Sequence, residues 1–385
     1  MRIAVVMVCA VVATIVYVMI PSAPASGIAV ETSAGPVRVD PVAKDLENPW
    51  GLAFLPGGQM LVTEQRGRLW LIREDGSRSR VEGLPPIEMI GQGGLMDVVA
   101  ARDFAETRTV FLTYTAPDGG ETRTTLASAT LDPERPVLHD LHILLEQEPA
   151  ISSSRHFGSR VVEAPDGTLW LTIGDRGRRP MAQDTSNTIG KVLRVNRDGS
   201  IPEDNPFADG GGHPAIWSWG HRNPQGAALG PEGGLWTVSH GARGGDEINR
   251  PEQGKNYGWP EVSYGTHYSG EPFPENEKAG TVQPLHYWVP SIAPSGMMFY
   301  SGKLWPDWEG DIFVGALKYK LIARLEREDG DLREAERLFA NRFGRIRDVR
   351  EGPEGAIWFL TDAADGVLYR SEERRVGKEC FLLCR

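Results

Sequence analysis

Cysteine is almost absent from the body of this chain. Its 385 residues include only Cys9, Cys380 and Cys384, which all lie near one end or the other. The long stretch between them therefore has no disulfide, no thiolate nucleophile and no cysteine-ligated zinc site. Folding of that stretch does not depend on an oxidising compartment.

Helical periodicity and net positive charge are also missing. No segment holds an apolar stripe at helical spacing between recognisable caps, which predicts little helix. The formal net charge is −11, which argues against general binding of nucleic acid. Glycine and proline are abundant instead, at 45 and 28 residues, and this composition is typical of a turn-rich fold.

One long apolar run stands at the N-terminus. Arg2 precedes the run Ile3–Ile20, and the triplet Ala23-Pro24-Ala25 follows it. This order predicts an export signal over 1–25, cleaved after Ala25, and a periplasmic or secreted protein. The run is also long enough for an uncleaved membrane anchor, so both interpretations stay open.

A strand-centred pattern repeats along the chain. Small or apolar residues lead into a Pro/Asp/Glu-Gly turn, followed by an apolar strand that often ends in Thr. Four clear copies and two looser ones are present: 54–64, 163–175, 229–241 and 351–362, then 107–115 and 308–318. Six such units predict an all-β chain folded as a six-bladed β-propeller.

The repeat also predicts the domain boundaries. The propeller should occupy 46–370, preceded at 26–45 by a linker and an edge strand that completes the last blade. Val37, Val39 and Val42 are the expected inward positions of that strand. The connections at about 176–215 and 250–290 are rich in Pro, Gly, Asn and charge, so we expect loops there.

The last segment, 371–385, breaks this pattern. It resembles a translated sequencing adapter, and we exclude it from the predicted fold. A genuine basic tail is the alternative.

Three motifs precede predicted strands and carry polar groups. His156 lies in Arg155-His156-Phe157-Gly158-Ser159-Arg160, where a neutral imidazole can act as a general base, although most histidines are structural. Arg222 and Asn223 precede a proline and supply planar donors for a developing oxyanion, or else form a turn. Gln92 lies among glycines that permit close approach of a ligand or merely make a turn.

Two further groups indicate ions. The segment from His240 to Glu247 combines glycine-rich turns with acidic residues, which suits calcium but lacks the EF-hand spacing. Lys318, Arg345 and Arg347 are cations near strand ends, and residues two apart in a strand share a face. Converging cations suit a ligand with several carboxylates, whereas surface ion pairing is the alternative.

Taken in order, these motifs resemble the soluble PQQ-dependent aldose sugar and glucose dehydrogenases of the glucose/sorbosone dehydrogenase family. The resemblance covers about Leu46 to Tyr369, and its motifs are His-Phe-Gly-Ser-Arg, Gly-His-Arg-Asn-Pro-Gln-Gly, Gly-Gly-Asp-Glu-Ile-Asn, Gly-Lys-Asn-Tyr-Gly-Trp-Pro and Arg-Ile-Arg-Asp-Val. It implies a six-bladed propeller, with pyrroloquinoline quinone (PQQ) and calcium as cofactors.

The resemblance also implies residue roles. His156 would be the base acting on the C1 hydroxyl of an aldose, and Arg222 would stabilise developing charge. The cofactor ligands would be Gln92, Arg222, Asn223, Lys318, Arg345 and Arg347. The carbonyls of Gly241 and Ala242 would bind the active-site calcium, and Glu247 with the Tyr257 carbonyl would bind a second, structural calcium. Relatives commonly have Pro where this chain has Ala242.

The expected partners are an aldose and an external electron acceptor, and monomer and homodimer both stay open. A calcium-dependent lactonase-like propeller is an alternative, but it needs a carboxylate-rich metal centre and no cations for a quinone. A non-catalytic propeller that binds a protein or glycan is a third interpretation.

Overall fold

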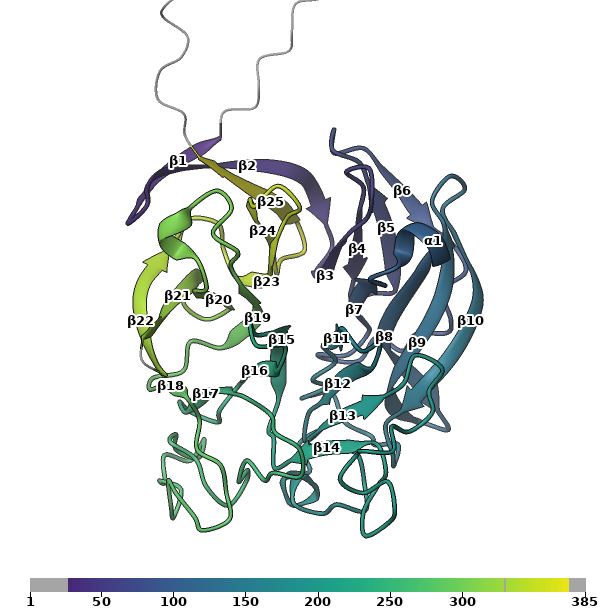
Figure 1. Cartoon of the computed structure of the whole chain (residues 1–385), viewed down its shortest axis with the longest axis vertical. Helices are drawn as coiled ribbons and strands as arrows, with labels where there is room; N and C mark the ends of the chain where they lie inside the picture. The colour runs from purple at the N-terminus through teal and green to yellow at the C-terminus, as the bar shows by residue number, and fades with distance from the viewer. Residues whose placement is uncertain (1–26, 329, 374–385) are drawn as a thin grey trace, which may run out of the picture.

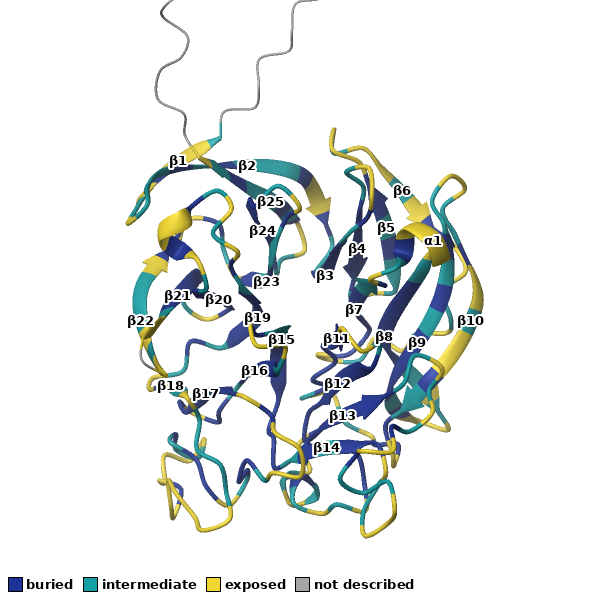
Figure 2. Cartoon of the chain, viewed as in Figure 1, coloured by how far each residue is buried: buried dark blue, intermediate teal, exposed yellow. Residues whose placement is uncertain are grey.

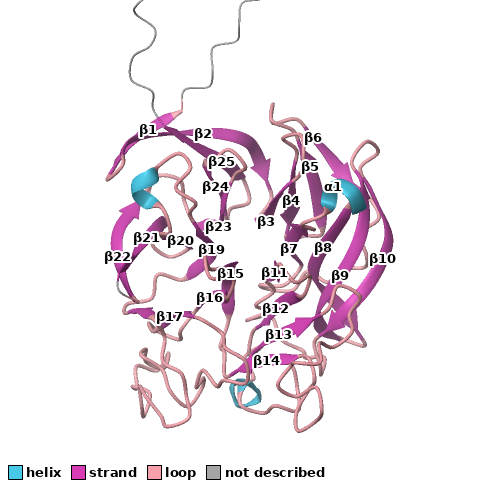
Figure 3. Ribbon diagram, in the orientation of Figure 1, coloured by secondary structure: helices cyan, strands magenta, loops and turns pink. Residues whose placement is uncertain are grey.

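The computed structural model describes residues 27–328 and 330–373, and strands account for most of its regular structure (Figure 3). Six antiparallel sheets surround a central axis (Figure 1), which confirms the predicted all-β, six-bladed propeller. Helix in this part is limited to α1 (Phe104–Thr107) and the 3₁₀ turns Arg179–Ala182 and Pro306–Trp308. No helix in these ranges is long and apolar enough to cross a membrane.

Each of the first three blades has four strands, numbered from the axis outward. The first blade contains β3 (Pro49–Phe54), β4 (Met60–Glu64), β5 (Arg68–Ile72) and β6 (Arg78–Val81). The second contains β7 (Leu95–Ala100), β8 (Thr109–Asp118), β9 (Glu121–Asp132) and β10 (Val137–Glu146). The third contains β11 (Val161–Glu163), β12 (Leu169–Ile173), β13 (Lys191–Val195) and β14 (Ile216–Trp219).

The next two blades repeat this order, and the sixth has five strands. The fourth blade contains β15 (Pro224–Leu229), β16 (Leu235–Ser239), β17 (Asp246–Asn249) and β18 (His286–Trp288). The fifth contains β19 (Pro294–Phe299), β20 (Ile312–Ala316), β21 (Leu321–Glu328) and β22 (Asp331–Leu338). The sixth contains β23 (Ile346–Glu351), β24 (Ile357–Thr361), β25 (Gly366–Glu373), β2 (Gly35–Leu46) and β1 (Ile28–Thr32). The innermost strands contact one another around the ring, since β3 touches both β7 and β23.

The N-terminal strand closes the ring, as predicted. β2 pairs with β25, so the two ends of the described chain share the sixth blade. Val37 and Val39 are buried, whereas Val42 is only half-buried and packs against the edge of the core. A register shift between Pro41 and Ala43 puts Ala43 in the buried position instead. The segment 26–45 was predicted to contain a linker and an edge strand, but it also contains β1, which forms a hairpin with β2.

The repeated pattern marks the second strand of every blade. β4, β12, β16, β20 and β24 are buried along their whole length because neighbouring blades cover both faces (Figure 2). Burial on two faces explains the continuous apolar runs. In one copy of the preceding turn, Gly167 has φ +85° and Asp166 Oδ1 accepts a hydrogen bond from the Thr168 N–H at 2.9 Å. Glycine adopts this left-handed conformation without strain.

Two segments predicted as loops contain strands. Segment 176–215 holds β13, and segment 250–290 holds β18. The strand β13 was not predicted because it contains Lys191 and Arg194, and charged residues are seldom found in a buried strand. Their charges are satisfied locally: Lys191 Nζ donates to the carbonyls of Met181, Ala182 and Ile189, and Arg194 pairs with Asp166 and Asp204.

β25 runs three residues past the predicted boundary at 370. Ser371 is buried and pairs with Val39, and its Oγ accepts a hydrogen bond from the Ile357 N–H at 2.9 Å. The proposed export signal, 1–25, and residues 374–385 of the predicted tail lie outside the described residues.

Candidate functional site

A cavity of about 290 Å³ opens at the axis, where the loops before the inner strands meet. It brings together four of the predicted cofactor residues, Gln92, Asn223, Arg345 and Arg347. Its other lining residues are Trp50, Gln65, Gly91, Gln225, His240, Ala293, Leu317 and Asp362. Two larger hollows, of about 840 and 520 Å³, contain none of the predicted site residues.

His156 lies beside this cavity with its ring fixed by a carboxylate. Its backbone N–H donates to Gln92 Oε1 at 2.7 Å, and its Nδ1 lies 2.6 Å from Asp175 Oδ1. Asp175 Oδ2 accepts a further hydrogen bond from Trp259 Nε1 at 2.8 Å. A carboxylate on Nδ1 favours the tautomer that carries its proton there, which leaves the Nε2 lone pair free to accept a proton.

The surroundings keep His156 neutral. Burial lowers the pKa of His156, the hydrogen bond that His156 donates to Asp175 raises it, and the nearby Arg222 cation lowers it, so that the net pKa is below the ordinary value. Burial raises the pKa of Asp175, but the bond to His156 and the charge of Arg222 outweigh it, so this pKa is lowered. The pair is therefore an ionised carboxylate that orients a neutral imidazole.

Arg222 forms no ion pair in the described part of the chain. Its guanidinium donates to the His240 carbonyl and to the Tyr268 hydroxyl, each at 3.2 Å, and lies over the Trp259 ring at 5.2 Å. Its Nε is buried without a hydrogen-bond partner. A buried guanidinium with an unused donor suits an anionic ligand.

Asn223 turns its amide toward the same cavity. Its Oδ1 accepts hydrogen bonds from the Gly158 N–H at 3.2 Å and from Gln225 Nε2 at 3.3 Å. These two bonds fix the amide plane, so the Nδ2 donors are left for a ligand in the cavity. The alternative prediction, a turn in which Asn223 caps its own backbone, does not describe this geometry.

Arg345 and Arg347 meet on one carboxylate. Both guanidinium groups bind Asp362 Oδ2, at 2.8 and 3.0 Å, while Ile346 between them is buried in the blade. Burial raises the pKa of Asp362, but the two cations outweigh it and hold this pKa below its usual value. Two cations share one anion, so the cluster keeps a net positive charge. Arg347 Nε is also buried without a partner.

Lys318 lies outside the cavity lining. Its side chain is exposed, with Nζ 5.1 Å from the centre of the Tyr319 ring. Its neighbour Leu317 does line the cavity, which places Lys318 next to the rim.

The turn after β16 presents two free carbonyls. The Gly241 N–H donates to Asp246 Oδ1 at 2.9 Å, while the carbonyl oxygens of Gly241 and Ala242 accept no hydrogen bond from the described residues. Both residues are buried. Buried carbonyls without partners are costly and fit a hard cation such as calcium.

Glu247 and Tyr257 are the residues predicted for a second, structural calcium. Glu247 lines a smaller cavity with Gly241 and Arg222, and burial raises its pKa to about 7. Tyr257 is not part of that lining; its ring stacks on His221 at 4.7 Å. Within 27–328 and 330–373 no group of three or more His, Cys, Asp or Glu side chains could hold a metal ion.

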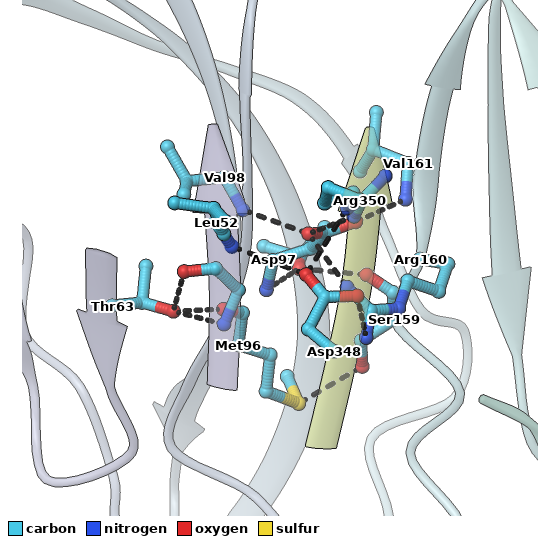
Figure 4. A network of polar contacts seen from close by, with 12 residues as sticks. Leu52, Thr63, Met96, Asp97, Val98, Ser159, Arg160, Val161, Asp348 and Arg350 are labelled. Carbon is cyan, nitrogen blue, oxygen red and sulfur yellow. Dashed lines mark hydrogen bonds and ion pairs between the residues drawn. The ribbon is translucent and has the colours of Figure 1, made fainter. Parts of the chain in front are cut away.

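Arg160, Arg350, Asp97 and Asp348 form a buried ion-pair cluster (Figure 4). Arg160 binds Asp97 and Asp348 at 3.0 Å each, and Arg350 binds the same carboxylates at 3.2 and 3.1 Å. Arg160 also donates to the Gln225 carbonyl at 2.8 Å and lies 4.2 Å from the centre of the Trp50 ring. Because Gln225 and Trp50 line the cavity, the cluster supports its walls.

Sequence reasoning missed the residues that position the predicted ones. Asp175, Asp362, Trp259 and Gln225 were not predicted. A signal was present for two of them, because two of the clear copies of the repeat end in an aspartate: Asp175 follows β12 and Asp362 follows β24. In a propeller these ends lie close to the axis, so an acid there is a candidate partner.

Comparisons with known proteins identify the family of the chain. Residues 46–370 match the glucose/sorbosone dehydrogenase family. The aldose sugar dehydrogenase YliI of Escherichia coli (strain K12) is 41% identical over 347 residues, covering 88% of this chain and 93% of that protein. The quinoprotein glucose dehydrogenase B of Acinetobacter calcoaceticus is 29% identical over 413 residues, covering 85% of each.

Solved structures show the same architecture. The crystal structure of the soluble aldose sugar dehydrogenase from Escherichia coli in the apo form superposes with a TM-score of 0.85 at 41% identity, covering 88% of this chain and 100% of that one. The PQQ-bound form of aldose sugar dehydrogenase from Streptomyces coelicolor shares the fold, with a TM-score of 0.72 at 24% identity and coverage of 91% and 100%. The chain belongs to the glucose/sorbosone dehydrogenase family of propeller-fold sugar dehydrogenases.

Proposed function

We propose that this protein oxidises aldose sugars at C1 to lactones, with PQQ and calcium as cofactors and an external electron acceptor. The observation that carries the proposal is the neutral His156, oriented by Asp175, beside an axial cavity rich in cations and amides. The family and its named relatives support the reaction class.

The cavity has the donor set that PQQ needs. Gln92, Asn223, Arg345 and Arg347 line it, and Arg222 and Asn223 would lie beside the quinone oxygens. Arginine forks match carboxylates, of which PQQ has three. When bound, PQQ supplies an acceptor for the electron pair of the C1–H bond. Lys318, the remaining proposed ligand, lies at the rim with its side chain exposed beside Tyr319.

His156 acts as the base in this proposal. Its Nε2 takes the proton of the C1 hydroxyl, while Asp175 holds the ring and stabilises the imidazolium that forms. A positioned base of this kind typically contributes ~10²–10⁴ in rate. Arg222 opposes negative charge that develops next to it.

The carbonyls of Gly241 and Ala242 would hold the active-site calcium. Glu247 lies on the same small cavity as Gly241, so the second, structural calcium proposed for Glu247 and the Tyr257 carbonyl would lie near this ion. Ala242 leaves the turn less restrained than proline would, which predicts weaker calcium binding than in relatives with proline.

A lactonase-like propeller would use a carboxylate-rich metal centre, and the described residues form none. Export to the periplasm remains part of the proposal on the strength of the N-terminal segment.

The test is a titration of the cofactor-free protein with PQQ and calcium, during which dye reduction by several aldoses is followed. We expect oxidation that requires PQQ and is strengthened by calcium. Absence of PQQ-dependent oxidation with every aldose would contradict the proposal.

A further inference from the structure

Tyr268 is the most exposed large apolar side chain among the described residues, at 65% of its full accessibility. It is nevertheless attached to the proposed active site. Its hydroxyl accepts a hydrogen bond from Arg222 Nη2 at 3.2 Å, and the Arg222 guanidinium carbon lies 6.0 Å from the centre of its ring. Arg222 is also close enough to His156 to lower the pKa of that histidine. The Tyr268 ring therefore stands at the solvent side of the proposed catalytic groups.

The loop that carries Tyr268 is anchored on the proposed calcium turn. The Arg243 N–H donates to the Thr266 carbonyl at 3.1 Å, and the Thr266 N–H donates to the Arg243 carbonyl at 3.4 Å. Gly265 packs so closely on the neighbouring segment that a side chain there would collide with the Gly244 carbonyl, and a side chain at Gly245 would collide with the backbone of Gly265. The loop therefore cannot move independently of the segment after Ala242.

A second attachment lies on the other side of the tyrosine. The His267 ring packs on Phe273, with ring centres 4.0 Å apart, and its Nδ1 lies 3.0 Å from Arg179 Nη1. Arg179 in turn lies over Trp259, whose indole holds Asp175. Tyr268 is thus exposed but preorganised, because its loop is held by contacts that run through Arg179 and Trp259 to Asp175, the partner of the proposed base.

This combination is typical of a recognition side chain. An exposed aromatic ring costs free energy, and tyrosine offers a large, rigid contact surface with a polar tip. An aldose ring has the complementary form, because its C–H groups make an apolar face and its hydroxyls point outward from the edge. Sites for small ligands combine such apolar surfaces with a few placed polar groups.

We infer that Tyr268 is the platform on which the C–H face of the aldose lies, so that its C1 hydroxyl reaches His156. The inference rests on the proposed function, since it names the surface that selects a sugar ring. It also implies that the calcium turn and the sugar platform are ordered together, because Arg243 and Thr266 join them.

The test compares two substitutions at this position. Tyr268→Ala removes the ring and should raise KM for an aldose about tenfold, with little change in kcat, because the ring contributes binding and not chemistry. Tyr268→Phe keeps the ring and loses only the bond to Arg222, so it should retain most of the sugar affinity. Ile143→Ala on the outer strand β10, another exposed apolar side chain, is the control and should leave KM unchanged.

Calorimetric titration of the cofactor-free protein with the same aldose gives a second readout that does not need activity. We expect Tyr268→Ala to weaken sugar binding and Tyr268→Phe to preserve it, with melting temperatures confirming that both variants fold. Unchanged KM and affinity in Tyr268→Ala would overturn the inference. Equal damage in both variants, expressed as a loss of kcat, would also overturn it, because the hydroxyl and not the ring would then matter.

The two readouts separate this inference from the proposed function. If the wild-type protein oxidised no aldose, the proposed function would fail, yet ring-dependent sugar binding would still support the platform. If the wild-type protein bound no aldose in the calorimeter, the platform would be refuted directly.

Discussion

His156 and Asp175 set the pH dependence expected of the enzyme. Burial, the largest influence, and the Arg222 charge lower the pKa of His156, and Asp175 only partly offsets them. The base must be neutral to accept a proton, so its useful form is present above the lowered pKa. We predict that kcat/KM stays constant from neutral pH to below 6.5 and falls only as pH drops through that lowered value.

Asp175→Asn tests the cause of this profile. The substitution removes the carboxylate that raises the pKa of His156, so the acid limb should move to lower pH, and the rate at pH 7 should fall at least about tenfold because the ring loses its orientation. Asp209→Asn, at an exposed position, is the matched control. Two results would count against this account: an acid limb of the wild-type profile at or above pH 6.5, or an acid limb that moves to higher pH in Asp175→Asn. Initial rates measured between pH 4.5 and about 8 decide between these outcomes.

At the residue scale, the sequence predicted the groups that face the ligand better than the groups that hold them. His156, Arg222 and Asn223 stand in motifs with distinctive neighbours. Asp175 lies 19 residues from His156 and meets it only when β11 and β12 pair, and Trp259, which donates to Asp175, comes from the loop before β18 in the next blade. Lys318 was predicted from its charge, but charge alone does not say where a flexible side chain points.

At the scale of elements, the last strand β25 includes residues beyond the predicted end of the propeller at 370. Ser371 is buried and accepts a hydrogen bond from the Ile357 backbone, so its hydroxyl belongs to the sheet. Ser371→Ala leaves that N–H without a partner and should lower the free energy of unfolding by about 1–3 kcal/mol. Glu372→Ala, at an exposed neighbouring side chain, should change it by less than about 0.5 kcal/mol. Denaturant titration of both variants is the measurement, and equal stability would contradict the placement of Ser371.

The turn at Ala242 offers a second prediction at this scale. The Ala242 N–H donates no hydrogen bond to the described residues, so proline would remove no observed bond there. A proline that fits the turn reduces the freedom of the ion-free state, so Ala242→Pro should tighten calcium binding about two- to fivefold. Calcium titration of PQQ-dependent activity would show the shift. Weaker binding with intact folding would mean that the turn adopts a backbone conformation that proline cannot.

Segments without the repeat were the hardest to predict. β13 and β18 lie in stretches rich in Pro, Gly and charge, and their pairing depends on neighbours across the sheet rather than on their own pattern. The second strands were predictable because burial on both faces forces an apolar run.

At the scale of the whole molecule, the ion-pair cluster of Arg160, Arg350, Asp97 and Asp348 joins blades far apart in sequence. Arg160 connects the second, third, fourth and sixth blades through its bonds to Asp97, Gln225 and Asp348. Arg160→Met leaves two buried carboxylates with one shared cation and should cost about 3–5 kcal/mol of unfolding free energy. Arg337→Ala, which breaks an exposed pair with Glu334, should cost no more than about 1 kcal/mol. Similar losses in the two variants would show that the cluster does not lock the blades.

The propeller itself was predictable from the spacing of one repeated strand, because closed rings of sheets impose the same burial on every blade. The cavity was predictable only as a meeting point of loops. Its volume, its ion pairs and the position of the Tyr268 loop follow from tertiary packing, which no local pattern contains.

The central claim is that His156 is the base of a PQQ-dependent aldose dehydrogenase. It is tested most directly by comparing wild-type protein with His156→Ala, and with His142→Ala as a control at an exposed histidine, in PQQ binding and in aldose turnover. We predict that His156→Ala binds PQQ nearly as well as wild type, while turnover falls by ~10²–10⁴. Wild-type turnover in His156→Ala, or no PQQ-dependent turnover in the wild-type protein, would contradict the account.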